Sequence, residues 1–142
     1  MNMALIFRTL VLLAVANGTP VIVKRVFGAR ADHAIDCGVR LADGRFMFGP
    51  SKTIRGVISS VIATALIAVA VGLTVYAGAV IALGAMGGDL ASSFVKRRLG
   101  LEPSSKATGL DQIPEALLPC LLLSAILPLT AGDIAVIVLL FF

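Results

Sequence analysis

Two aspartates flank a short basic cluster near the middle of the chain. Asp89 ends an apolar run, and Asp111 follows a later polar loop. Between them stand three consecutive bases, Lys96, Arg97 and Arg98. Carboxylate oxygens are ligands that Mg²⁺ prefers, and bases neutralise phosphate oxygens. This order of residue types indicates a site for a metal-bound di- or triphosphate.

A helix that continues through Asp89 would gather most of these groups on one face. At 100° per residue, Ser93, Lys96 and Arg97 lie about +40°, −20° and +80° from Asp89, whereas Arg98 points backwards. The first three then join Asp89 in one polar stripe, and Arg98 is interpreted as a membrane anchor. In the alternative, all three bases are anchors and Asp89 is a helix-end charge facing water. Residue types alone do not choose between them.

A polar segment earlier in the chain, the first polar loop, is a candidate partner for the basic cluster after Asp89. Residues 24–55 carry seven bases against three acids. Glycine and proline shape the backbone beside Ser, Lys, Thr and Arg side chains in the stretch Phe48-Gly49-Pro50-Ser51-Lys52-Thr53-Ile54-Arg55-Gly56. This composition predicts a phosphate-binding loop, although the spacing is not that of a Walker A motif. The only histidine, His33, is interpreted as a solvated loop residue, and no arrangement supports covalent catalysis.

The elements that must position these residues are apolar. Of the 142 residues, 58% are hydrophobic and 14% charged, and a soluble domain of this length cannot bury so much apolar surface. The sequence therefore predicts an all-α integral membrane protein in one domain, residues 1–142. Five helices are expected, at about 3–23, 56–72, 74–97, 114–128 and 132–142. The last is too short to cross a bilayer, so it is expected to stop inside the membrane or to be truncated.

The uncharged run over residues 57–88 predicts two spans joined by a turn near Gly72. An even number of spans puts both basic segments on one side. Their excess of Lys and Arg predicts that this side is the cytoplasmic face of the cell membrane, with the N-terminus outside. A signal peptide cleaved after Ala14-Val15-Ala16 is the alternative for the first segment. Asp133 is expected to cap the last helix.

Several motifs, in their order along the chain, resemble the CDP-archaeol synthase family. These are membrane cytidylyltransferases related to the CDP-diacylglycerol synthases. The matching pieces are Ala16-Asn17-Gly18-x-Pro20, Ile35-Asp36-x-Gly38, Asp43-Gly44-Arg45, Phe48-Gly49-x-x-Lys52-Thr53-x-Arg55-Gly56, Gly88-Asp89-Leu90-x-x-Ser93-x-x-Lys96-Arg97-Arg98 and Asp111-Gln112. Thr108-Gly109-Leu110 stands where the ester-lipid relatives carry a His-Gly-Gly run, which favours the archaeol branch.

The resemblance implies a five-helix membrane fold whose site is formed by two cytoplasmic polar loops. There CTP, Mg²⁺ and 2,3-di-O-geranylgeranylglyceryl phosphate would give CDP-archaeol and pyrophosphate. Asp89 and Asp111 would hold the metal and, with Lys96, be catalytic. The residues around the nucleotide would be Lys52, Thr53, Arg55, Ser93, Lys96 and Arg97. Asn17 and Asp36 would also line the site.

The sequence leaves other functions open. The nearest is a phosphatidate cytidylyltransferase, and another is a non-catalytic membrane scaffold. A transporter or channel is disfavoured because residues 57–88 carry no charge. The expected partners are CTP, the lipid phosphate and membrane lipids, without nucleic acid, and the sequence does not indicate an oligomeric state. The family usually continues into a full fifth helix and a basic tail, so both alternatives for the last helix, a stop inside the membrane and a truncated chain, stay open.

Overall fold

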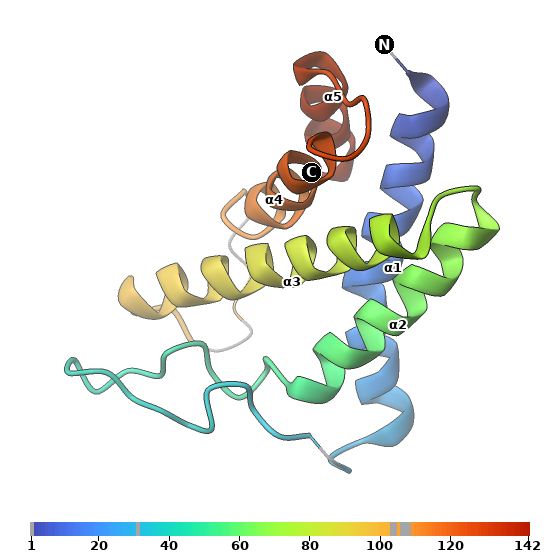
Figure 1. The fold of residues 1–142 in the computed structure, drawn as a ribbon. Helices are drawn as coiled ribbons and strands as arrows, with labels where there is room; N and C mark the ends of the chain where they lie inside the picture. Colours follow the sequence, from blue (N-terminus) through green and yellow to red (C-terminus); the bar gives the residue numbers. More distant parts are fainter. Residues whose placement is uncertain (1, 31, 103–104, 106–108) are drawn as a thin grey trace.

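The computed structural model describes residues 2–30, 32–102, 105 and 109–142. Its helices are, in chain order, α1 (Met3–Phe27), α2 (Ile54–Ala70), α3 (Val75–Arg98), α4 (Gln112–Ser124) and α5 (Ala131–Phe141). In the described residues the only β-type pairing consists of two isolated bridges, Ala34 with Thr53 and Arg40 with Phe46. The expectation of an all-α fold with five helices is confirmed. Figure 1 shows α2 beside α1, with α3 crossing them and α4 lying along α3.

Helix α1 extends to Phe27, four residues beyond the predicted end at residue 23, although it contains Pro20. Proline has no N–H, so the carbonyl oxygen of Ala16 loses its helical partner. The Ser60 hydroxyl of α2 donates to that oxygen at 2.8 Å. The hydrogen bond lost at Pro20 is thereby replaced from a neighbouring helix, and α1 continues to the bases at its end.

Glycines let α3 approach both of its neighbours closely. A Cβ added at Gly78 would lie 2.6 Å from Cβ of Ala68 in α2. One added at Gly84 would lie 2.6 Å from Cα of Pro119 in α4. Real Cβ atoms do not come so near, so these contacts exist only because the side chain is a hydrogen atom.

Helix α5 begins at Ala131, whereas a cap at Asp133 would place its first residue at position 134. The prediction that Asp133 is the N-cap is wrong, because Thr130 holds that position and Asp133 is the third helical residue of a capping box. The Asp133 carboxylate accepts from the backbone N–H of Thr130 and from that of Asn2, both at 3.0 Å. These bonds tie the start of α5 to the start of α1.

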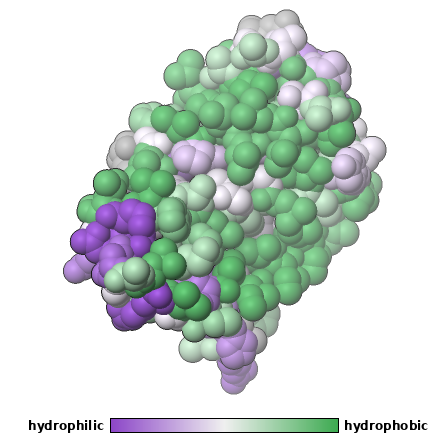
Figure 2. Space-filling view, turned by 60° about the vertical axis from the view of Figure 1, so that its left-hand side comes forward, coloured by the Kyte–Doolittle hydropathy of each residue, from purple (hydrophilic) through white to green (hydrophobic). Residues whose placement is uncertain are grey.

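The outer surface is largely apolar. Among the described residues, α1 and α3 are the two helices long and apolar enough to cross a membrane, and α2, α4 and α5 are shorter apolar helices. Large apolar side chains such as Phe7, Leu66 and Leu139 are two thirds or more exposed. Apolar residues therefore cover the outside of the protein as well as filling its core. Figure 2 shows hydrophilic residues gathered mainly toward one end of a hydrophobic surface. Such a surface suits contact with lipid.

Candidate active site

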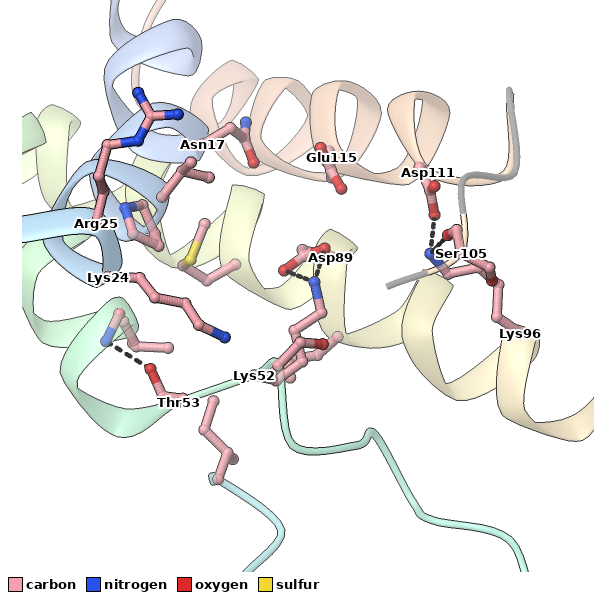
Figure 3. Close-up of a pocket in the computed structure, with 18 residues that line it drawn as sticks. Asn17, Lys24, Arg25, Lys52, Thr53, Asp89, Lys96, Ser105, Asp111 and Glu115 are labelled. Atoms are coloured by element: carbon pink, nitrogen blue, oxygen red, sulfur yellow. Dashed lines mark hydrogen bonds and ion pairs between the residues drawn. The ribbon is translucent and has the colours of Figure 1, made fainter. Parts of the chain in front are cut away.

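A cavity of about 640 Å³ lies where the ends of four helices meet the two polar segments. Figure 3 shows side chains from all of these elements converging on it. Residues from both segments, including Lys52 and Ser105, line it. Six of the predicted site residues are part of the lining: Asn17, Lys52, Thr53, Asp89, Lys96 and Asp111.

The Lys52 ammonium binds the Asp89 carboxylate across this cavity. Its Nζ lies 2.5 Å from both Oδ1 and Oδ2 of Asp89 (Figure 3). Asp89 belongs to α3, and Lys52 stands just before Thr53, whose hydroxyl caps α2 by accepting from the Gly56 N–H at 3.2 Å. Both charged side chains are about one fifth exposed. The pair is thus accessible from the cavity.

A second acid–base pair lies further along the same face of α3. Lys96 is two helical turns beyond Asp89, and its Nζ lies 2.7 Å from Oδ1 of Asp111. The same ammonium donates to the carbonyl oxygen of Ser105 at 3.0 Å. The cavity therefore holds two acid–base pairs. Of the predicted stripe, Asp89 and Lys96 line this cavity, whereas Ser93 and Arg97 do not.

Glu115 is a lining residue that the sequence analysis missed. It lies in the first turn of α4, and Figure 3 shows its carboxylate near that of Asp89. The sequence could have indicated it, because Glu115 is the single charged residue of an otherwise apolar helix. Charged residues in membrane helices are rare and usually functional. Lys24 and Arg25 also line the cavity, because α1 is longer than predicted.

Asp36 lies outside the cavity lining and organises the loop beside it. Its carboxylate accepts backbone N–H groups from Gly38 at 3.0 Å and from Phe48 and Gly49 at 2.9 Å. Burial by itself raises the pKa of this carboxyl, but the N–H groups outweigh it and hold the pKa below its ordinary value. Asp36 thus fixes the approach to Lys52, and a direct contact with substrate stays a prediction.

Arg55 and Ser93 also lie outside the lining. The Arg55 guanidinium donates to the carbonyl oxygens of Gly28 and Arg30 and to Asp32 at 3.1 Å, so it closes the base of the loop. The Ser93 hydroxyl is buried and has no hydrogen-bond partner in the described part of the chain. Their predicted contacts with the triphosphate remain untested.

The bases after Lys96 contact the loops and not the cavity. Arg97 donates to the carbonyl oxygen of Glu102 at 2.6 Å and lines a different, smaller cavity, so its phosphate contact stays a prediction. The interpretation of Arg98 as a membrane anchor stays a prediction. Its guanidinium lies 2.5 Å from the Asp43 carboxylate and donates to the Phe46 carbonyl oxygen at 2.8 Å, so it holds the first loop against α3.

The acids of the cavity suit a magnesium ion that is bound partly by substrate. Among the described residues, no group of three or more His, Cys, Asp or Glu side chains is placed to hold a metal. Mg²⁺ usually binds through one or two carboxylates, waters and substrate phosphates, and not in an all-protein cage. The carboxylates of Asp89 and Asp111 in one open cavity fit that mode of binding.

Comparison with known proteins shows which family this chain belongs to. Residues 2–142 match the family described as "CarS-like: CDP-archaeol synthase". The chain belongs to the CDP-archaeol synthase family. The CDP-archaeol synthase of Aeropyrum pernix is 46% identical over 106 residues, covering 70% of this chain and 57% of that protein. The enzyme of Methanopyrus kandleri is 45% identical over 85 residues, covering 56% of this chain and 49% of that protein.

The fold has a solved counterpart. A structure reported as "Structural insight into an intramembrane enzyme for archaeal membrane lipids biosynthesis" superposes with a TM-score of 0.80 at 33% identity, covering 99% of this chain and 89% of that one. Together with the apolar helices, this likeness makes the chain a membrane protein. The matches to the two curated relatives span about half to three fifths of their lengths.

Proposed function

We propose that this protein transfers CMP from CTP to an isoprenoid ether lipid phosphate, 2,3-di-O-geranylgeranylglyceryl phosphate, giving CDP-archaeol and pyrophosphate. The observation that carries the proposal is the pairing of Lys52 with Asp89 and of Lys96 with Asp111 in one cavity of a chain from this family. Family membership favours this activity over a non-catalytic scaffold.

The two ion pairs hold the binding groups in place until substrate arrives. Triphosphate oxygens would take the ammonium groups of Lys52 and Lys96, and the carboxylates of Asp89 and Asp111 would then be available to a cation. When bound there, Mg²⁺ supplies charge neutralisation for the phosphate oxygens. Asn17 and Thr53, at the cavity wall, offer further polar contacts.

The reaction needs no strong base. The lipid phosphate is already an anion, and its oxygen forms a bond to the α-phosphorus of CTP. The bond from that phosphorus to the oxygen bridging to the β-phosphorus breaks, and pyrophosphate leaves. Lys52 and Lys96 stabilise the negative charge that accumulates on the leaving group. The apolar side chains of Val21, Val57 and Leu90 line the same cavity and suit the isoprenoid chains where they join the glycerol.

We propose further that the protein crosses the cell membrane several times. The N-terminus would lie outside the cell. The cavity and its bases would lie on the cytoplasmic side, where CTP is available. The ends of α1 and α3 carry these bases, at Lys24, Arg25, Lys96, Arg97 and Arg98.

The direct test incubates the purified protein with labelled CTP, Mg²⁺ and either the ether or the ester lipid phosphate. Formation of CDP-lipid from the ether substrate alone is expected, and product from the ester substrate alone would indicate a phosphatidate cytidylyltransferase. Binding is checked separately, because Mg²⁺–CTP should raise the melting temperature in a concentration-dependent way. A scaffold would give neither product nor stabilisation.

A further inference from the structure

A second cavity, of about 210 Å³, lies beside the end of α3 and shares no lining residue with the first. It is built where the first polar loop contacts the turn after α3. Three of its lining residues are arginines, and Glu102 is its only acidic one among the described residues. The lining includes Arg40, Arg45, Phe46, Arg97, Gly100 and Glu102.

Arg97 is the buried member of this group. The residue is only 3% exposed, and its Nε and Nη1 atoms have no hydrogen-bond partner in the part of the chain that the structure describes. A guanidinium stays protonated in proteins, and burying a charge with unused donors is costly unless a partner compensates. Among the described residues its side chain makes one hydrogen bond, from Nη2 to the carbonyl oxygen of Glu102.

The other two arginines are held in place by hydrogen bonds that, among the described residues, use one nitrogen of each guanidinium. Nη1 of Arg45 donates to the carbonyl oxygens of Arg97 and Arg98 at the end of α3. A Cβ added at Gly100, whose φ is +80°, would lie 3.1 Å from Nη2 of Arg45, so glycine admits this guanidinium. The Arg40 guanidinium lies 3.9 Å above the Phe46 ring, and its Nη1 donates to the Gly44 carbonyl oxygen.

The nearby acids offset this charge only in part: Asp43 attracts Arg45 and Glu102 attracts Arg97, but neither acid forms a salt bridge with these arginines in the described part of the chain. The Asp43 carboxylate is paired with Arg98, and the Asp36 carboxylate accepts three backbone N–H groups. Glu102 is exposed, so its carboxylate is screened by solvent. We infer that the second cavity is an anion site that takes a phosphate group on Arg40, Arg45 and Arg97. Arginine clusters with free donors bind phosphate strongly because the hydrogen bonds are charge-assisted.

Phosphate could reach this site as a free anion or as the headgroup of an anionic lipid, and the experiment separates the two. In detergent, the melting temperature is followed during titration with inorganic phosphate, against potassium chloride at equal ionic strength. In nanodiscs without free phosphate, phosphatidylglycerol is compared with phosphatidylcholine. Arg40→Gln is the test variant because Arg40 is exposed and loses no core contact. Arg30→Gln is the matched control, since Arg30 is exposed and lines neither cavity.

Arg40→Gln is expected to weaken the stabilisation by at least ~10-fold in apparent affinity, the size of one lost hydrogen bond between charged groups. A loss confined to the phosphate titration identifies a free anion, and a loss confined to phosphatidylglycerol identifies a headgroup. If Arg40→Gln matches Arg30→Gln in both arms, the inference is wrong. The proposed activity is read independently, because stabilisation by Mg²⁺–CTP reports the first cavity and is expected to be unchanged in Arg40→Gln.

Discussion

Replacing Gly88 by alanine would force α3 and α4 apart directly beside Asp89. An added Cβ would lie 2.5 Å from the carbonyl carbon of Pro114 and 2.8 Å from the backbone nitrogen of Glu115. Both neighbours are backbone atoms of the first turn of α4, so no side-chain rotation relieves the overlap. Since non-bonded carbons approach to about 3.5–4.0 Å, the two helices would have to separate by about 1 Å.

Gly87→Ala is the matched control for this change. Its Cβ would lie 3.3 Å from Cδ2 of Leu118, the end of a flexible side chain. Both substitutions gain about 1 kcal/mol of helix propensity, so the difference between them isolates the overlap at Gly88. Overpacking of this kind costs about 1–3 kcal/mol. The melting temperature of Gly88→Ala should then be lower than that of Gly87→Ala by roughly 3–10 °C.

The separation would also displace Glu115, and Asp111 at the N-cap of α4, from Asp89. Misplacing reacting groups by about 1 Å can cost ~10²-fold in rate, so CMP transfer by folded Gly88→Ala should fall by about that factor. The assays are thermal unfolding in detergent and product formation from labelled CTP, with Gly87→Ala measured alongside. Equal stability and equal turnover in the two variants would refute the argument that close contact of α3 and α4 builds the site.

Three further outcomes are expected. Asp89→Asn, in folded protein, should lower turnover at least ~10²-fold, and near-normal turnover with added Mg²⁺ would contradict its role as a metal ligand. Lys96→Ala should raise the apparent KM for CTP about tenfold, whereas an unchanged KM would leave this lysine with a structural role only. For Asp36, the folded-state pKa lies below the unfolded value of 3.8, so its contribution to stability is present above that pH and lost as the pH falls through the folded pKa. Unfolding measured between pH 3 and 7, as a rough range spanning the ordinary carboxyl pKa, should show a smaller acid destabilisation in Asp36→Asn than in the unchanged protein.

The helices, and the helix face that Asp89 shares with Lys96, could be predicted from the sequence because both depend on local chemistry. Apolar runs of helical length predict helices wherever the chain is surrounded by lipid. The spacing of Asp89 and Lys96 puts both on one helix face whatever the helix packs against. Helix ends were less predictable. The end of α1 depends on Ser60 of α2 replacing the hydrogen bond lost at Pro20, and that contact is 44 residues away along the chain.

The partners of each charged side chain were decided only by tertiary structure. Arg97 and Arg98 follow Lys96 directly, yet neither lines the first cavity, because the loops that pack on α3 supply their partners Glu102 and Asp43. Glu115 joins the site because glycines in α3 let the first turn of α4 approach Asp89. Sequence by itself determined which residues carry charge and which face of a helix they occupy. Which of them meet depends on the packing of distant segments, which no local pattern specifies.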